Sequence, residues 1–256
     1  MGCGVRQVYY AEGEYLHNVK SLAVSTPWRR HWQMGIKGLT YCTHALGPIM
    51  RWMKGDRIVR VCCEDAGASS HYADAEGEPF AGDAAVMLAK TEAGRLIKIR
   101  VDLTSNRPYG LNFELQGTRG VVEVRNGEGQ DNWGQGRIAL AAAGQEEVEG
   151  WSDLPTVLAS DLYDALLPAP YKSGSPEAET ALQSGHGGSD YYTTATFIAA
   201  CRGEGEEVVG IHEAMDMTLP GLASQLSAEK GGEWVDVPDS REWAAAGVAS
   251  GGGAKL

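Results

Sequence analysis

The sequence lacks the features that would mark it for a membrane or a nucleic acid. Its 256 residues contain no apolar run long enough to span a bilayer and no block of like charge. The net charge of -12 comes from acids scattered along the chain, so we predict neither nucleic acid nor an anionic membrane as a partner. Met1 leads directly into a strand-like segment, from which we expect no signal peptide and a cytoplasmic location.

Cysteine is sparse, with five residues and no CxxC pair. Cys62 and Cys63 are adjacent and would point to opposite faces of a strand, so we interpret all five as reduced thiols. The histidines show no metal-ligand spacing such as HxxxH or HExxH, and no GxSxG nucleophile elbow is present. We therefore expect no metal site and no Ser-His-Asp hydrolase.

What is present is an ordinary globular composition, with 43% hydrophobic and 22% charged residues. A strand over residues 5–16 precedes a polar, aromatic loop around residues 27–32 and a helix over residues 38–53 that contains Pro48. The middle of the chain favours strands, over residues 57–63, 84–91, 96–104, 111–115 and 121–124. A Gly-rich loop with one short strand follows over residues 126–150. The remaining elements are helices over residues 154–167, 187–201 and 212–230, the last interrupted at Pro220-Gly221, and a strand over residues 234–237.

The strand over residues 96–104 alternates cleanly between two faces. Its apolar side chains are Ile97, Ile99, Val101 and Leu103, and its polar ones are Lys98, Arg100, Asp102 and Thr104. We predict an α+β fold over residues 1–243, an open-faced, mainly antiparallel β-sheet with helices packed on one face, and a disordered Ala- and Gly-rich tail over residues 244–256. The polar face stays open, which predicts a homo-oligomer formed through the sheet face.

The segment from Tyr41 to Pro48 carries the most chemistry. On a helix, Tyr41 and His44 are three residues apart and share a face, and Pro48 cannot donate to the carbonyl of residue 44, which predicts a helix break there. Imidazole is the side chain best suited to proton transfer near neutral pH. From the residues alone, His44 as a buried structural histidine and Tyr41 as a core aromatic both remain open.

Other polar and aromatic groups are weaker candidates. Arg29 lies between tryptophans and suits a hydroxylated ligand, although an ordinary surface arginine fits as well. His186 lies in a Gly-rich turn before a helix, where backbone amides bind polar oxygens or simply form the turn. Tyr15 and His17 share a strand face, and Tyr109 follows a proline in a loop. A cofactor-independent glycosidase would use the carboxylates of Glu12 and Glu14.

Six segments occur in an order that resembles a known family. They are Glu12-Gly13-Glu14-Tyr15-Leu16-His17, Trp28-Arg29, Tyr41-Cys42-Thr43-His44-Ala45-Leu46-Gly47-Pro48, Asn106-Arg107-Pro108-Tyr109, Gln116-Gly117-Thr118-Arg119-Gly120 and Gly185-His186-Gly187-Gly188-Ser189-Asp190. Together they resemble the C-terminal domain of the Gfo/Idh/MocA oxidoreductases, above all the branch with NAD-dependent glycosidases related to α-N-acetylgalactosaminidase. The resemblance covers residues 5–240.

The resemblance implies a substrate-binding domain of an NAD- or NADP-dependent oxidoreductase that acts on a sugar or polyol. Tyr15, Arg29, Tyr41, Tyr109 and His186 would bind the sugar, and His44 or Tyr41 would take the hydroxyl proton. The nicotinamide would lie against the Tyr41-Cys42-Thr43-His44 segment.

Two further functions remain open within the resemblance. In the glycosidase branch, transient oxidation of one sugar carbon acidifies the neighbouring C–H, and elimination, water addition and re-reduction follow. Thr40 and Cys42 depart from residues typical of the dehydrogenases and the glycosidases respectively, so neither reaction is excluded. The chain has no strand followed by GxGxxG, which implies that a separate Rossmann domain supplies the cofactor site, or that the chain is a detached non-catalytic binding or assembly module.

Overall fold

The computed structural model describes residues 5–53, 55–66, 84–127, 136–145, 147–154, 176–205 and 208–245. The chain forms two compact units, and each is described by itself. The first combines Met1–Trp151 with Ala214–Leu256, and the second is Ser152–Glu213. The predicted helix over residues 154–167 and most of the predicted tail lie outside the described residues.

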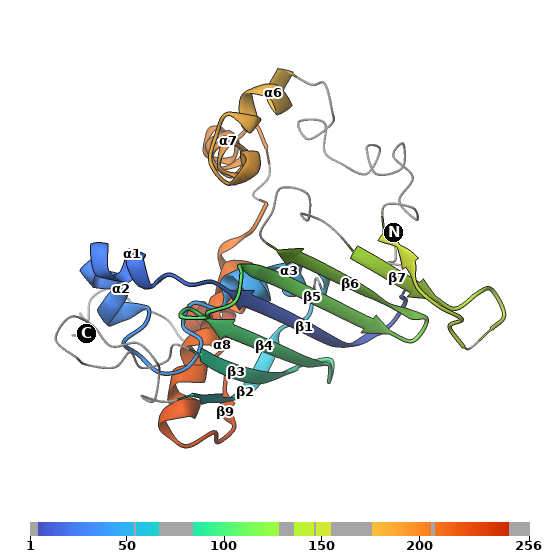
Figure 1. Cartoon of the computed structure of the whole chain (residues 1–256), viewed down its shortest axis with the longest axis horizontal. Coiled ribbons are helices and arrows are strands. Elements are labelled where there is room, and N and C mark those ends of the chain that lie inside the picture. The colour runs from blue at the N-terminus through green and yellow to red at the C-terminus, as the bar shows by residue number, and fades with distance from the viewer. Residues whose placement is uncertain are drawn as a thin grey trace. The chain divides into compact units, whose positions relative to one another are not determined.

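A twisted sheet forms the centre of the first unit (Figure 1). Its strands are β1 (Val8–Leu16), β2 (Ile58–Asp65), β3 (Ala84–Thr91), β4 (Leu96–Asp102), β5 (Gly110–Gly117), β6 (Gly120–Gly127), β7 (Gly136–Leu140) and β9 (Val235–Asp236). Within this unit they lie in the order β7-β6-β5-β1-β4-β3-β2-β9. β1 pairs in parallel with β4 and antiparallel with β5, and the other pairings of the unit are antiparallel. The mainly antiparallel sheet is therefore confirmed, with β1 inserted between two later strands.

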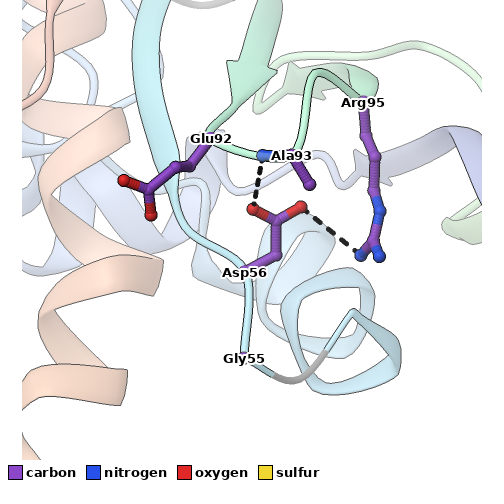
Figure 2. A pocket seen from close by; sticks show the side chains of 5 residues that line it. All are labelled: Gly55, Asp56, Glu92, Ala93 and Arg95. Carbon is purple, nitrogen blue, oxygen red and sulfur yellow. Dashed lines mark hydrogen bonds and ion pairs between the residues drawn. The ribbon is translucent and has the colours of Figure 1, made fainter.

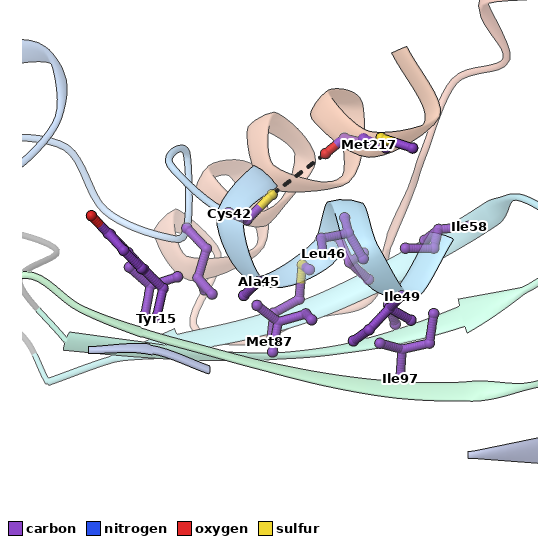
Figure 3. Close-up of a cluster of buried hydrophobic side chains, with 14 of the residues drawn as sticks. Tyr15, Cys42, Ala45, Leu46, Ile49, Ile58, Met87, Ile97 and Met217 are labelled. Carbon is purple, nitrogen blue, oxygen red and sulfur yellow. Dashed lines mark hydrogen bonds between the residues drawn. The ribbon is translucent and has the colours of Figure 1, made fainter. Parts of the chain in front are cut away.

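Helices cover the apolar face of this sheet. α3 (Thr43–Trp52) and α8 (Ile211–Glu229) pack over it, while α1 (Lys20–Ser25) and α2 (Pro27–Trp32) follow directly on β1, and α9 (Ser240–Ala245) follows β9. Figure 3 shows side chains from both layers meeting in one core, among them Ile49 of α3, Met87 of β3 and Ile97 of β4, all fully buried. The alternation predicted for β4 is confirmed, because Ile97, Ile99 and Val101 are buried there.

The second unit holds a short helical segment. It contains α6 (Pro176–Leu182), the 3₁₀ turn η4 (His186–Gly188) and α7 (Ser189–Arg202), preceded by the two-residue strand β8 (Ser152–Asp153). α7 confirms the helix predicted over residues 187–201 to within a turn. Among the described residues, no helix is long and apolar enough to cross a bilayer, and no group of three or more His, Cys, Asp or Glu side chains is arranged to hold a metal ion.

Three expectations for the helices were wrong. Residues 27–32 form α2 rather than a loop, because Pro27 at the first helical position starts the helix. The helix predicted over residues 38–53 begins only at Thr43, so Tyr41 precedes it, and Pro48 lies inside α3 without ending it. Pro220 likewise lies inside α8, which is continuous.

Candidate functional site

Four aromatic side chains from three parts of the chain meet at the end of β1. Tyr15 comes from β1, Tyr41 from the turn before α3, His44 from the first turn of α3, and Tyr109 from the loop before β5. The His44 ring stacks on Tyr15 with centroids 4.5 Å apart and on Tyr41 with centroids 4.9 Å apart. Tyr109 meets Tyr15 edge-on at 6.1 Å. We call these four residues the aromatic cluster.

The start of α3 is held in place from the sheet side. A Cβ atom added to Gly13 of β1 would lie 2.5 Å from the Ala45 carbonyl oxygen, so only glycine allows the helix to approach the strand this closely. Leu46 and Ile49 of α3 are fully buried on the same side. The position of His44 therefore follows from the packing of its own helix on β1.

α8 holds the residues that precede α3. Ser224 is fully buried, and its Oγ accepts a hydrogen bond from the Leu39 N–H at 2.7 Å. A Cβ atom on Gly221 would lie 2.6 Å from Cys42 Sγ and 2.7 Å from the Leu39 carbonyl oxygen. The backbone on both sides of Tyr41 is thus fixed against α8 by a buried hydrogen bond and by close packing.

Exposure divides the segment from Tyr41 to His44. His44 and Thr43 are exposed, Tyr41 is half-buried, and Cys42 is fully buried. The exposed imidazole excludes the reading of His44 as a buried core histidine. Burial raises the pKa of the Cys42 thiol to about 12, and its Sγ lies 3.7 Å from the Met217 carbonyl oxygen. The Cys42 side chain belongs to the core, so any contact of this residue with a cofactor would run through its backbone.

Burial favours the neutral phenol at two tyrosines of the cluster, Tyr15 and Tyr109. Tyr15 is only 6% exposed, and this burial, followed by the nearby Tyr41 and Tyr109 phenols, raises its pKa well above the ordinary value. Burial also raises the pKa of Tyr109. The Tyr15 hydroxyl lies 2.8 Å from His17 Nδ1, and the His17 ring meets Tyr109 edge-on at 5.0 Å. His17 therefore packs against the cluster; in the sequence it was indicated by its shared strand face with Tyr15 and by its place in the segment from Glu12 to His17.

The other two residues predicted to bind substrate lie on separate elements. Arg29 is on α2, where its guanidinium lies 4.2 Å from the centre of the Trp28 ring and its Nη1 donates to Thr26 Oγ1 at 3.3 Å. His186 belongs to the second unit, where its Nδ1 lies 2.9 Å from Asp190 Oδ1. The structure thus brings together Tyr15, Tyr41, His44 and Tyr109. Arg29 and His186 instead contact residues close to them in the sequence.

Glu12 and Glu14 lie on the opposite, polar face of the sheet. Glu12 Oε2 accepts from Lys98 Nζ at 2.7 Å, and Glu14 Oε2 accepts from Asn112 Nδ2 at 2.8 Å. Burial alone would raise the pKa of Glu12, but the hydrogen bonds from Lys98 and Tyr10, together with the charges of Lys98 and Arg125, leave it below its ordinary value. A general acid of a glycosidase needs a raised pKa, so these contacts argue against a cofactor-independent reaction at Glu12.

A hollow lies at the far end of the sheet from the aromatic cluster, between the start of β2 and the β3–β4 turn (Figure 2). It has a volume of about 270 Å³ and is lined by Gly55, Asp56, Glu92, Ala93 and Arg95. Asp56 Oδ1 accepts from the Ala93 N–H at 3.2 Å, and Asp56 Oδ2 lies 3.4 Å from Arg95 Nη1. These contacts tie down the turn, which makes the hollow a structural feature of the hairpin rather than a candidate site.

Residues 4–244 match the family model for the glycosyl hydrolase 109, C-terminal domain. A glycosyl hydrolase family 109 protein of Saccharopolyspora erythraea is 29% identical over 254 residues, which cover 91% of this chain and 50% of that protein. An α-N-acetylgalactosaminidase of Tannerella forsythia is 26% identical over 244 residues, covering 90% of this chain and 48% of that one. The chain thus spans about half the length of the curated relatives it matches.

Solved structures share the fold at lower identity. Levoglucosan dehydrogenase in complex with NADH and L-sorbose is 18% identical with a TM-score of 0.64, covering 92% of this chain and 60% of that one. An inositol dehydrogenase homologue from Azotobacter vinelandii, complexed with NADH and myo-inositol, is 18% identical with a TM-score of 0.54. The match covers 90% of this chain and 57% of that one. The predicted resemblance to the oxidoreductase C-terminal domain is confirmed for the fold. The match over residues 4–244 shows that the chain belongs to the family of glycosyl hydrolase 109 C-terminal domains.

Proposed function

We propose that this chain is the substrate-binding domain of an NAD(P)-dependent enzyme that oxidises a carbon of a sugar or polyol. The observation that carries this proposal is the aromatic cluster, in which the exposed imidazole of His44 stacks on Tyr15 and Tyr41 while Tyr109 meets Tyr15 edge-on. Flat rings stack against the C–H face of a sugar, while phenol and imidazole groups exchange hydrogen bonds with its hydroxyls. One small surface thus offers both kinds of recognition.

Within this proposal, His44 is the proton-transfer group for the reacting hydroxyl. Its imidazole is exposed, and its orientation is set by stacking on Tyr15 and Tyr41. Tyr41 and Tyr109, both half-buried, would hold other hydroxyls of the same sugar. Arg29 would add a charged donor from α2, with its guanidinium already oriented by Trp28.

The exposed edge of the cluster fits a nicotinamide dinucleotide, NAD or NADP. Thr43 and His44 are exposed there, and the stacked rings of His44 and Tyr41 offer a planar surface of the kind a planar heterocycle packs on. When bound, the nicotinamide would accept a hydride from the sugar carbon. The sequence has no strand followed by GxGxxG, so the phosphates would be held by another domain, joined to this chain or separate.

A second reaction is favoured by the family itself. The names of the family model and of the Tannerella α-N-acetylgalactosaminidase support a glycosidase, and we propose that oxidation of the sugar would be transient in it. The same cluster would serve, because the same hydroxyl must lose and regain its proton. The two reactions differ in their balance: a dehydrogenase accumulates reduced cofactor, whereas the glycosidase releases an aglycone without net reduction.

The experiment joins this chain to a nicotinamide-dinucleotide-binding domain and supplies either a free sugar or a nitrophenyl α-glycoside. NADH absorbance that grows with each turnover supports the dehydrogenase. Nitrophenol release that requires NAD but leaves no NADH supports the glycosidase. If neither signal exceeds that of the binding domain alone, the result supports the third alternative, a detached non-catalytic binding module. Titration of NAD into the pure chain should then release no heat.

The polar face of the sheet supports a further part of the proposal, a homo-oligomer. Val86 and Leu88 of β3 are 40% and 36% exposed on this face, beside the ion pair of Lys98 with Glu12. Leu88→Lys would place a charge in an apolar contact, whereas Leu22→Lys changes a leucine of similar exposure on α1. We expect sedimentation to show self-association that the Leu88 variant weakens and the Leu22 variant does not. A strictly monomeric wild-type chain would contradict this part.

A further inference from the structure

Tyr15 and His17 form a hydrogen-bonded pair on the inner side of the aromatic cluster. The Tyr15 hydroxyl and His17 Nδ1 are 2.8 Å apart. His17 follows the last residue of β1, and its backbone N–H donates to the Asp102 carbonyl at 2.8 Å. The parallel pairing of β1 with β4 therefore continues as far as His17 and fixes its backbone next to Tyr15.

The rings around the pair restrict its geometry. His17 meets the Tyr15 ring at 87° and the Tyr109 ring at 89°, with centroids 5.7 Å and 5.0 Å away. Tyr109 in turn meets Tyr15 at 82°. The other titratable groups of the cluster, Tyr41 and His44, stand against Tyr15. Mutual edge contacts of this kind hold both side chains in one orientation.

Tyr15 alone is poorly suited to accept a proton from a ligand by first becoming a phenolate. Its ring is 6% exposed, and burial raises its pKa, so the phenolate is disfavoured at neutral pH. A neighbour that takes the phenol proton removes this difficulty, because Tyr15 then stays neutral throughout. His17 Nδ1 is placed to be that neighbour.

We propose that His17 is a positioning residue that acts through Tyr15 and makes the Tyr15 hydroxyl a second proton-exchanging group beside His44; this rests on the proposed function. In the step, a sugar hydroxyl proton moves to Tyr15 Oη while the Tyr15 hydroxyl proton moves to His17 Nδ1. One O–H bond breaks on the sugar and one on Tyr15, and an O–H bond and an N–H bond form. The sugar oxygen keeps its electron pair, and the positive charge passes to the imidazole.

The step requires that Nδ1 of neutral His17 carries no hydrogen, and this is measured in the pure chain without any ligand. The ¹⁵N NMR signal of His17, identified by its loss in His17→Gln, should show an unprotonated, hydrogen-bond-accepting Nδ1. Because a hydrogen bond to that lone pair favours the neutral ring, Tyr15→Phe should move the His17 titration to higher pH. Tyr9→Phe changes a tyrosine that is 54% exposed and should leave it unchanged.

A protonated Nδ1 in neutral His17, or the same titration in the wild type and Tyr15→Phe, overturns the proposal. Kinetics separate proton acceptance from orientation, because Asn at position 17 retains a hydrogen-bonding group but does not take up a proton near neutral pH. In the chain joined to its cofactor domain, both His17→Ala and His17→Asn should lower kcat at least about tenfold and flatten its pH profile.

Wild-type kcat in His17→Asn would reduce His17 to an orienting role and refute the proton transfer. If the joined protein turns over no sugar at all, the proposed function fails, while the NMR measurement still decides the state of the pair. If it turns over sugar and the His17 variants match the wild type, only the present inference fails.

Discussion

Two buried serines on α8 allow the support of the candidate site to be tested separately from the stability of the fold. Ser224 accepts from the Leu39 N–H at 2.7 Å, and Ser227 accepts from the Cys63 N–H at 2.8 Å. Both side chains are fully buried, and each hydroxyl also donates to a backbone carbonyl. They differ in the backbone N–H that each accepts from, because Leu39 leads into the aromatic cluster while Cys63 belongs to β2.

Replacing either serine by alanine leaves one buried N–H without its acceptor. Such an orphaned donor costs about 1–3 kcal/mol, and the better helix propensity of alanine returns about 0.5 kcal/mol. We therefore expect Ser224→Ala and Ser227→Ala to lose about 0.5–2.5 kcal/mol each, measured by urea unfolding of the pure chain. Equal losses would make the two variants a matched pair.

The readout that separates the pair is the NMR signal of the exposed His44 imidazole, identified by its loss in His44→Gln. Ser224→Ala should shift this signal, because the backbone before α3 loses its tie to α8, whereas Ser227→Ala should leave it in place. Equal effects of the two variants on His44, or no effect of Ser224→Ala, would refute the view that α8 holds the site.

Two further predictions concern the sheet beneath the site. Gly13→Ala would place a Cβ 2.5 Å from the Ala45 carbonyl oxygen and should lower the free energy of unfolding in urea by about 1–3 kcal/mol. In the control Gly150→Ala, the added Cβ meets nothing within 4 Å, so the free energy of unfolding should stay within about 0.5 kcal/mol of the wild type. Equal losses in the two variants would contradict the close approach of α3 to β1. Burial, opposed by a hydrogen bond from Gln116 and reinforced by the charges of Glu12 and Glu123, raises the pKa of Glu114 above its ordinary 4.5. The folded state therefore binds the proton more tightly, and stability is lost as pH rises from 4.5 through the raised pKa. Glu114→Gln should unfold at higher urea than the wild type at neutral pH but not well below pH 4.5, and a pH-independent difference would contradict the shift.

Much of the sheet could be predicted because one of its faces is buried. The bounds of β3, Ala84–Thr91, follow from alternation that ends at a turn, and the β3–β4 hairpin follows from the glycine in that turn. The pairing of β1 with β4 and β5 could not be predicted in this way. Alternation tells which face of a strand is buried, but it does not identify the neighbouring strand.

The helices were harder where burial is weak. α2 has no buried residue, so its sequence carries no apolar stripe of helical period. Pro48 suggested a break, but the carbonyl to which it cannot donate belongs to His44, an exposed residue near the start of the helix. The helix therefore continues through the proline.

The candidate site was recognised mainly through the order of its motifs rather than through local pattern. Tyr41 and His44 do not share a helix face, since Tyr41 precedes α3, yet their rings stack with centroids 4.9 Å apart. His17 was the weakest signal of the site, two residues from Tyr15 in a strand that ends between them. Its contact with Tyr15 depends on rotamers and on the loop that carries Tyr109, which no spacing rule describes.

The central claim, that the aromatic cluster moves a proton on a sugar, is tested most directly by His44→Ala in this chain joined to a nicotinamide-dinucleotide-binding domain. Because His44 is exposed, the variant should unfold within about 1 kcal/mol of the wild type. Its sugar turnover should fall by about 10²- to 10⁴-fold, the range supplied by a positioned acid or base. Wild-type turnover in a folded His44→Ala protein would contradict the account.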